Sequence, residues 1–187
     1  MTDTKHLTLP ELEAGLDDIR QSPRDAGVIE LIVRRPQAGA REELTEGRLD
    51  LVEGLVGDSW RSRGSSGTPD GSAHPEAQLT LMNARAIALL APERERWPLA
   101  GDQLYVDLDL SGDNLPPGTL LALGSAVIAV TVQPHTGCQQ FRERFGVDAL
   151  RFVNSPAGRQ LNLRGINAKV VQPGVVRVGD IVKRLPA

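Results

Sequence analysis

The 187-residue sequence predicts a mainly β protein, folded as a distorted closed β-barrel with a few short helices. Short runs rich in valine, isoleucine and leucine recur along the chain, and turns that contain glycine or proline separate them. Many short strands favour closure, because strands that pair all the way round leave no exposed edge. A parallel α/β sheet is the alternative, but it needs longer crossover helices than these spacings allow.

The first segment predicts an amphipathic helix over residues 9–20. Thr8 and Glu11 stand three apart, as in a capping box, and apolar residues follow at helical spacing, at Leu12, Leu16 and Ile19. We expect residues 1–24 to form an N-terminal helical appendage to a barrel domain that spans residues 25–187.

The barrel domain opens with a β-branched run over residues 28–34, which predicts a strand, and residues 49–53 are a weaker strand or turn candidate. Residues 61–75 carry serine, glycine and proline without apolar periodicity, so they predict a mobile loop. Such a loop is either a lid over a site or a disordered connection. Residues 78–82 resume a strand pattern, and Asn83 caps the helix that follows it.

Strict alternation over residues 105–110 predicts a half-buried strand, with Tyr105, Asp107 and Asp109 on the face opposite the aliphatic residues. A helical region is expected over residues 137–153. Further strands are expected over residues 120–123, 126–132, 167–171, 175–178 and 181–183.

Composition excludes several classes of function. The net charge of −3 gives no global preference for nucleic acid or for an anionic membrane. No apolar run approaches the roughly 18 residues of a membrane span, and the single cysteine excludes an intramolecular disulfide. The first residues lack the pattern of a secretory leader, so we expect a cytoplasmic protein.

The single cysteine, Cys138, is the strongest candidate for chemistry. It follows the strand-like run that ends near Pro134, and Thr136 with Gln139 has the spacing of a capping box. Cys138 is then expected as the second residue of a helix, where unpaired amides favour the thiolate. The alternative is a small buried apolar residue with no chemical role.

Basic residues gather after this cysteine. Residues 139–169 have a local balance of +4, with Arg142, Arg144, Arg151, Arg159, Arg164 and Lys169 against two acidic residues. Guanidinium groups bind phosphate bidentately, so the excess predicts an anionic ligand, such as a phosphate ester. Arg142 lies one helical turn from Cys138, and Arg164 directly precedes a strand; ordinary surface arginines are the alternative for the others.

His135, three residues before Cys138, has the ordinary pKa range for proton transfer near neutrality, as a proton donor or as a partner of another site residue. The sequence has no Cys-x-x-Cys, no His-Glu-x-x-His and no histidine pair. A zinc site made by the protein alone is therefore not expected. A metal can still arrive on a cofactor, with Cys138 as its protein ligand.

An ordered set of segments resembles the MOSC family, which is named for the C-terminal domain of molybdenum cofactor sulfurase. The resemblance covers roughly residues 25–185. It depends on the order in which several short segments follow one another around the cysteine. The pieces are 101–111, 114–118 (Asn-Leu-Pro-Pro-Gly), 123–127, 134–138 (Pro-His-Thr-Gly-Cys), 163–166 and 178–180.

The resemblance implies a distorted barrel and a cysteine that either ligates the molybdenum of a pterin cofactor or carries a sulfane sulfur. By position, Cys138 becomes the molybdenum ligand, and Arg142 and Arg164 become candidates for the pterin phosphate. Thr136, Asn114 and Arg151 complete the expected cofactor-binding set, and His135 joins Cys138 as a catalytic candidate. Pyridoxal phosphate has no support in the sequence.

Three functions follow from the resemblance. The first is a molybdenum-cofactor-dependent reductase of small N-hydroxylated or N-oxide-type molecules, which needs an external electron donor because the chain has no motif for a second redox centre. The second is a sulfur carrier that holds a persulfide on Cys138 and needs a sulfur donor. The third is a pterin- or anion-binding module that catalyses nothing.

Overall fold

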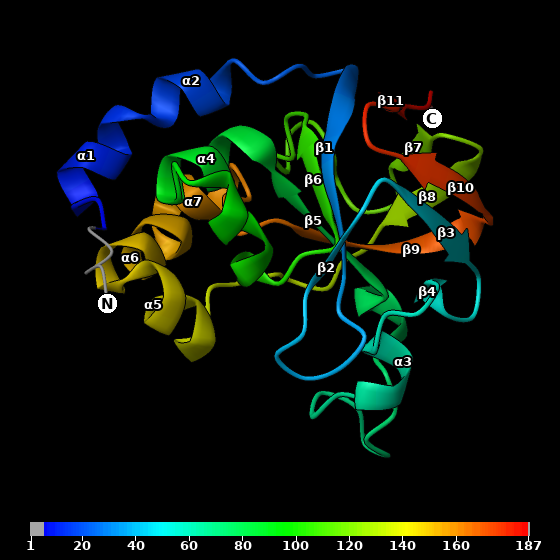
Figure 1. Cartoon of the computed structure of the whole chain (residues 1–187). Coiled ribbons are helices and arrows are strands. Elements are labelled where there is room, and N and C mark those ends of the chain that lie inside the picture. Colours follow the sequence, from blue (N-terminus) through cyan, green and yellow to red (C-terminus); the bar gives the residue numbers. More distant parts are fainter. Residues whose placement is uncertain (1–5, 187) are drawn as a thin grey trace.

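The computed structural model describes residues 6–186 and shows a closed barrel of seven strands (Figure 1). Around the barrel the order is β1, β11, β7, β8, β9, β5, β6 and back to β1. The strands are β1 Ala26–Arg34, β5 Leu79–Asn83, β6 Leu104–Asp107, β7 Leu120–Leu123, β8 Ala126–Val130, β9 Ile166–Gln172 and β11 Ile181–Arg184. The predicted fold class is therefore confirmed.

Strand β1 closes the barrel because it is long enough to pair with both of its neighbours. Its first residues pair antiparallel with β11, from Ala26 to Val28, and residues Val28 to Ile32 pair antiparallel with β6. An irregular register after Ile29 accompanies this change of partner. Strands β5 and β6 are parallel, whereas the other barrel pairs are antiparallel.

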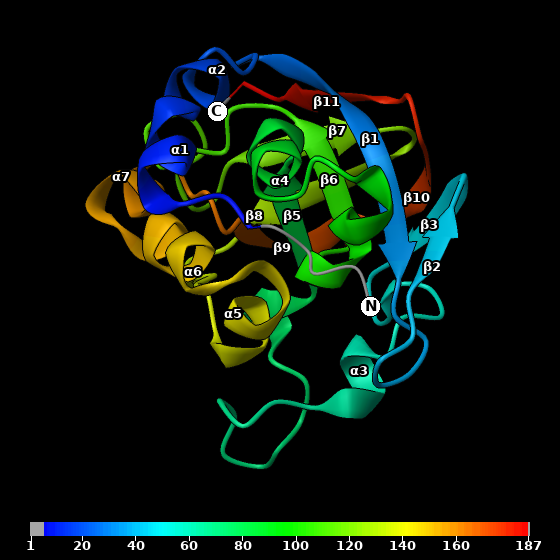
Figure 2. The same ribbon diagram turned by 60° about the vertical axis from the view of Figure 1, so that its left-hand side comes forward.

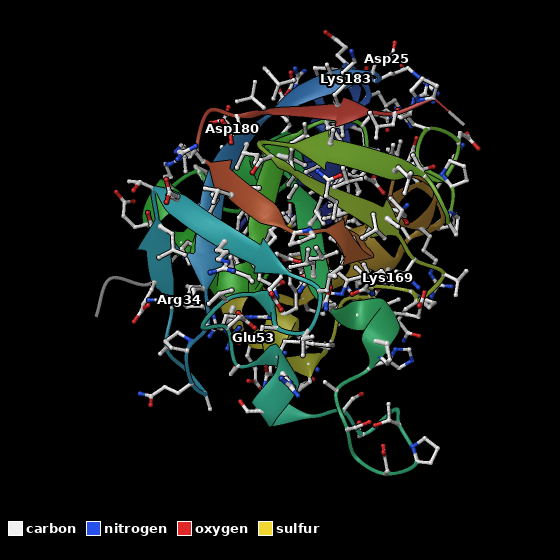
Figure 3. The ribbon with its side chains drawn as sticks, turned by 90° about the vertical axis from the view of Figure 1, so that its right-hand side faces the viewer. Asp25, Arg34, Glu53, Lys169, Asp180 and Lys183 are labelled. Atoms are coloured by element: carbon white, nitrogen blue, oxygen red, sulfur yellow. The ribbon has the colours of Figure 1, made fainter. Side chains whose placement is uncertain are left out.

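A small second sheet crosses one side of the barrel. Strand β3 (Glu46–Asp50) pairs with β10 (Gly174–Arg177) on one side and β4 (Gly54–Leu55) on the other. Strand β2 (Glu42–Leu44) pairs antiparallel with the last residues of β1, from Ile32 to Arg34. Figure 3 shows β3 and β10 on the face turned away from most of the helices.

The barrel interior is filled by aliphatic side chains from all seven strands. Ile29, Leu81, Leu104, Ile128 and Val182 are representative, because each is 0% exposed. Burial of such a side chain contributes about 1.5–3 kcal/mol. The sequence has only six aromatic residues, and none of them lies in this cluster.

A second apolar cluster lies between the outer surface of the barrel and a layer of helices. Outward-facing strand residues such as Met82 and Tyr105 pack there with Phe141, Phe145 and Phe152. Figures 1 and 2 show the helices gathered on one side of the barrel. They are α1 Leu9–Ala14, α2 Leu16–Arg20, α4 Ala84–Leu90, α5 Gln139–Phe145, α6 Val147–Asn154, α7 Pro156–Gln160 and the 3-10 helix η2 Arg94–Ala100.

The N-terminal segment differs from its predicted form in one respect. The capping box is present, since the backbone N–H of Thr8 donates to the Glu11 carboxylate at 2.8 Å. The helix expected over residues 9–20 is two helices that meet at Gly15. A Cβ at Gly15 would lie 2.6 Å from the methyl groups of Leu89, so glycine permits the close approach of α4.

On the face of residues 105–110 that was expected to be exposed, Asp107 and Asp109 are half-buried as predicted, whereas Tyr105 is fully buried. Tyr105 is 0% exposed because the helical layer covers the outer side of β6. Its hydroxyl donates a hydrogen bond to the carbonyl of Trp97 at 2.7 Å, which satisfies the buried oxygen. The prediction of an exposed Tyr105 is wrong.

Two further segments are more ordered than the sequence indicated. Helix α3 (Trp60–Arg63) occupies the start of the loop expected over residues 61–75, and the 3-10 helix η1 (Pro75–Ala77) begins at its end. The helical region expected over residues 137–153 divides at Gly146 into α5 and α6, and α7 follows it. Within residues 6–186, no helix has the length and apolar character needed to cross a membrane.

Candidate active site

The loop over residues 131–138 carries the predicted cysteine from the end of β8 to the start of α5 (Figure 1). Two asparagines tie the loop to its surroundings. Asn167 Nδ2 donates to two successive loop carbonyls, those of Gln133 and Pro134, at 3.0 and 3.3 Å. Asn154 accepts from the Gly137 N–H at 3.1 Å and donates to the Gly137 carbonyl at 3.3 Å. Both the N–H and the carbonyl of Gly137, the residue before the cysteine, are therefore hydrogen-bonded to Asn154.

Cys138 is exposed and directly precedes α5. Its backbone is extended, and it is the N-cap of the helix rather than the second helical residue that the sequence predicted. The expected cap formed by Thr136 is absent, because the helix begins only at Gln139. A Cβ at Gly137 would lie 2.8 Å from Cδ1 of Leu150, so a side chain there would require α6 side chains to move.

A chain of polar groups, His135, Asp102 and Arg164, runs inward from the partly exposed imidazole of His135. The imidazole Nε2 lies 2.8 Å from Oδ1 of Asp102, and Nη1 of Arg164 lies 2.6 Å from Oδ2 of the same carboxylate. Asp102 has a fully buried side chain, and Arg164 is 7% exposed. Arg164 also donates to the Ala100 carbonyl at 2.8 Å and stacks over the ring of Phe141, 5.0 Å from the centroid.

This arrangement fixes the protonation of the imidazole. Burial alone would raise the pKa of Asp102, but Arg164 and His135 outweigh it and hold the pKa at about 2. Burial and the guanidinium of Arg164 lower the pKa of His135, and Asp102 compensates only in part. His135 is therefore neutral near pH 7. A neutral ring beside a carboxylate donates through Nε2–H, which leaves Nδ1 as an acceptor.

A cavity of about 410 Å³ lies beside this chain of groups. His135, Thr136, Asn154, Arg159 and Arg164 line it, so two guanidinium groups and no carboxylate face it. The Nε of Arg164 is buried and has no hydrogen-bond partner among residues 6–186.

A smaller cavity of about 190 Å³ also borders His135. Pro134, His135 and Asn162 line both cavities. Gly165 lines the smaller cavity and has a positive φ of 113°. A Cβ there would lie 2.2 Å from the Leu81 carbonyl oxygen and 3.1 Å from Cδ2 of His135, so glycine is required beside the ring.

Four arginines converge on the segment that leads into Asp102. The carbonyls of Pro98, Leu99, Ala100 and Gly101 accept hydrogen bonds, in that order, from Arg41 at 3.1 Å, Arg144 at 2.7 Å, Arg164 at 2.8 Å and Arg35 at 2.7 Å. Burial and neighbouring guanidinium groups lower the pKa of Arg41, which indicates a local excess of positive charge. The carboxylate of Asp58 balances Arg35 through two hydrogen bonds of 2.9 Å.

The MOSC domain family matches residues 68–183, which is more than half of the sequence. This chain belongs to the MOSC family. MOSC domains are associated in general with binding of the molybdenum cofactor. A search of the curated proteins gave no match.

Two solved structures share the MOSC fold of this chain. YuaD from Bacillus subtilis has a TM-score of 0.63 and 17% sequence identity, and the alignment covers 85% of this chain and 95% of YuaD. YiiM from Escherichia coli has a TM-score of 0.54 and 18% identity, with coverage of 86% of this chain and 70% of YiiM. At these identities the likeness concerns the fold.

The structure of this MOSC domain brings together part of the predicted site. Thr136, His135 and Arg164 line the larger cavity, and Cys138 lies two residues beyond Thr136. Arg142 is exposed on α5 and Arg151 is exposed on α6, where it pairs with Asp148 at 3.2 Å; neither lines the two cavities that border His135.

Asn114 is placed elsewhere in the domain. Its side chain is fully buried, and Nδ2 donates to the carbonyls of Arg24 and Asp109 at 2.9 and 2.8 Å. Among the basic residues counted in the sequence, Lys169 pairs with Glu76 at 2.6 Å, on the face shown in Figure 3. The positive charge near His135 comes in part from Arg35, far upstream of the segment with the local excess.

Sequence reasoning missed Asp102 and Asn154. Asp102 precedes the apolar strand β6, and a lone acidic residue at such a position was the available signal. Asn154 ends α6, where an asparagine is common for local reasons, so its link to Gly137 gave no sequence signal. Among residues 6–186, no group of three histidine, cysteine or acidic residues forms a metal cluster.

Proposed function

We propose that this MOSC domain is a molybdenum-cofactor-dependent oxidoreductase that removes oxygen from the N–O bond of small molecules, with Cys138 as the protein ligand of the metal. The observation that carries the proposal is the larger cavity beside His135. It combines two arginines on its lining with an adjoining loop that presents an exposed thiol.

The residues present fit an anionic pterin cofactor. A cavity of about 410 Å³ has the size of ligand-binding pockets, which run from roughly 300 to 1,000 Å³. Arg159 and Arg164 suit a phosphate, and Asn154 and Thr136 supply neutral hydrogen-bonding groups. Thiolates are ligands for soft transition metals, which is the role we give to Cys138.

When bound, the cofactor would supply the exchange of two electrons and one oxygen atom with the substrate, and the electrons come from an external donor protein. The contribution of the protein lies in its own residues. Asn154 holds the backbone before Cys138, and Asp102 orients the imidazole of His135. Nδ1 of His135 can take a proton from solvent and release it readily, because Arg164 disfavours the imidazolium.

The test is the cofactor content of the full chain, purified from cells that make the molybdenum cofactor. Wild-type protein should hold molybdenum and pterin near one per chain, and Cys138→Ser should lose the molybdenum. Arg159→Glu should lower pterin content at least tenfold, because it reverses a charge on the cavity wall. Arg151→Glu is the matched control on an exposed site of α6 and should keep the wild-type content.

Wild-type protein without molybdenum or pterin would contradict this function. Equal pterin content in Arg159→Glu and Arg151→Glu would place the cofactor outside the larger cavity. Pterin retained by every variant, with no turnover of an N-hydroxylated compound by wild type and an artificial electron donor, would identify a binding module instead.

A sulfur carrier is the second candidate, and the exposure of Cys138 supports it. The thiol is exposed just before the start of α5, so a second protein can reach it. In this function Cys138 receives a sulfane sulfur from a donor protein and hands it to an acceptor. A mass increase of one sulfur atom on Cys138, in protein that holds no molybdenum, would favour the carrier over the reductase.

A further inference from the structure

We propose that a separate cavity beside α4, which we call the α4 cavity, binds an organic cation that has an apolar body and an ammonium group. Its volume of about 360 Å³ lies within the roughly 300–1,000 Å³ of ligand-binding pockets. It shares no lining residue with the two cavities that border His135. The proposal is therefore independent of the cofactor function.

Helix α4 provides much of the apolar floor of the α4 cavity. The helix contacts both α2 and β6, and Figure 2 shows it on the side of the barrel that carries the helices. Ala84, Ala88 and Leu89 from α4 line the cavity together with Trp97 from η2. Ala84 and Trp97 are buried, whereas Ala88 and Leu89 are half-buried, so part of this apolar surface faces solvent. A ligand that covers it removes apolar surface from water, which is favourable.

An additional residue in β1 brings an acidic group to the same outer surface. Ile29 pairs with Val106, and Leu31 pairs with the neighbouring Tyr105, so Glu30 has no counterpart on β6. Ile29 packs inside the barrel and Leu31 packs in the outer cluster, which means that the strand exchanges its faces across this bulge. Glu30 lines the α4 cavity, and its side chain is 42% exposed.

Two carboxylates on the lining accept no hydrogen bond from the described part of the chain. Arg85 donates to Asp107 at 2.8 and 3.2 Å, so these two residues neutralise each other. The Asp18 carboxylate lies 3.5 Å from Nη1 of Arg85, and the Glu30 carboxylate lies 3.9 Å from Nη1 of Arg94. Both guanidinium groups donate instead to the backbone carbonyl of the acidic residue. Asp18 and Glu30 can therefore accept from a ligand.

The surroundings of Trp97 already attract a positive group. The guanidinium of Arg94 lies over the indole ring, 4.7 Å from its centroid, and donates to the carbonyl of Glu30. The face of an aromatic ring attracts cations through its quadrupole. Arg94 is not on the lining, so it does not fill the cavity.

A monovalent organic cation fits these features better than a metal ion does. Among residues 6–186, no three acidic, histidine or cysteine residues come together as metal ligands. The lining holds three carboxylates and Arg85, and with Arg94 beside it the net charge is −1. One ammonium group balances this charge, and its N–H groups can donate to Asp18 and Glu30.

The experiment measures binding of three probes of similar size to the full chain by NMR. The probes are 2-phenylethylammonium, the neutral 2-phenylethanol and the anionic 3-phenylpropionate. We expect the ammonium probe to shift the indole N–H of Trp97 and the amide of Ala88, while the indole N–H of Trp60 on α3 stays in place. The alcohol and the carboxylate should bind about tenfold more weakly or worse, because they lack the charge that the carboxylates attract.

A first substitution tests the charge. Glu30→Gln should weaken binding of the ammonium probe about fivefold and leave the alcohol unchanged. Glu42→Gln is the matched control and should bind as wild type does. Glu42 also lies on a strand, pairs with an arginine and is 46% exposed, but it does not line the α4 cavity.

A second substitution tests the space. Ala88→Phe places a ring in the cavity and should abolish binding of the ammonium probe, whereas Ala88→Ser at the same position should retain it. If Ala88→Phe fails to fold, the comparison of Glu30→Gln with Glu42→Gln decides.

Three results would overturn the proposal. They are no shift of the Trp97 indole with the ammonium probe, equal affinity for the ammonium probe and the alcohol, and equal affinity of Glu30→Gln and Glu42→Gln for the ammonium probe. All of these measurements use protein without cofactor, so a failure of the proposed reductase function would leave the α4 cavity as a cation site.

Discussion

Asp102 and Arg164, 62 residues apart in the chain, form a buried ion pair in which Nη1 lies 2.6 Å from Oδ2. Asp102 lies just before β6, and Arg164 lies just before Gly165 and β9. The second carboxylate oxygen of Asp102, Oδ1, lies 2.8 Å from Nε2 of His135. Removal of either partner leaves an uncompensated buried charge, so the geometry of the site and the stability of the domain depend on the same contact.

Asp102→Asn is therefore expected to destabilise the domain by about 3–5 kcal/mol, the usual cost of breaking a buried pair on one side. Asp17→Asn is the matched control, because Asp17 pairs with Arg20 at 3.0 Å but is 86% exposed. It should change the free energy of unfolding by about 0.5 kcal/mol or less. Urea denaturation of the two variants measures this difference, and equal effects would contradict the buried pair.

Stability should fall in acid through the same carboxylate. The pKa of Asp102 is lowered from 3.8 to about 2, so the ionised form stabilises the folded state above pH 4. This contribution is lost as the pH falls through about 2, and it amounts to about 2 kcal/mol. The free energies of unfolding of wild type and Asp102→Asn, measured between pH 5 and 2, should converge toward low pH; parallel curves would count against the assignment.

Two variants should move the pKa of His135 in opposite directions. Arg164→Met removes a guanidinium that lowers this pKa, so the pKa should rise. Asp102→Asn removes a carboxylate that raises it, so the pKa should fall. NMR titration of the imidazole measures both shifts, and the nitrogen shifts near pH 7 should show a proton on Nε2. Shifts of the same sign would rule out the proposed chain of groups.

Loss of Asn154 should loosen the loop that holds Cys138. Asn154→Ala removes one acceptor and one donor from Gly137, at a cost of roughly 1 kcal/mol in stability. Hydrogen exchange of the Gly137 amide should become faster, while the exposed helical substitution Gln140→Ala should leave it unchanged. Exchange at Gly137 that is equal in both variants would show that the clamp has no role in ordering the loop.

The sequence predicted the barrel because strand patterns are local. Runs such as residues 28–34, and turns that contain glycine or proline, carry their signal within a few residues, and the structure confirms that strand. The local pattern did not predict the burial of Tyr105, because the helices that cover its side of the strand come from distant parts of the chain. Gly15 shows the same limit, since its role depends on Leu89 in α4.

The site was predictable only where its residues are close in sequence. His135, Thr136 and Cys138 lie in one loop, and Arg164 was identified from the strand that follows it. Asp102 contacts residues 33 and 62 positions away, so its role appears only in the folded chain. Two of the four arginines that converge on residues 98–101, Arg35 and Arg41, lie outside the segment with the local charge excess, so a local count of charge does not detect them.

The most direct test of the proposed function is X-ray absorption at the molybdenum edge, applied to wild-type protein and to Cys138→Ser, each incubated with an excess of cofactor so that the variant also takes up metal. If the thiolate of Cys138 is the protein ligand, the metal in wild type has one more sulfur neighbour than the metal in any loaded Cys138→Ser. An equal number of sulfur neighbours in both proteins would contradict the central role given to Cys138.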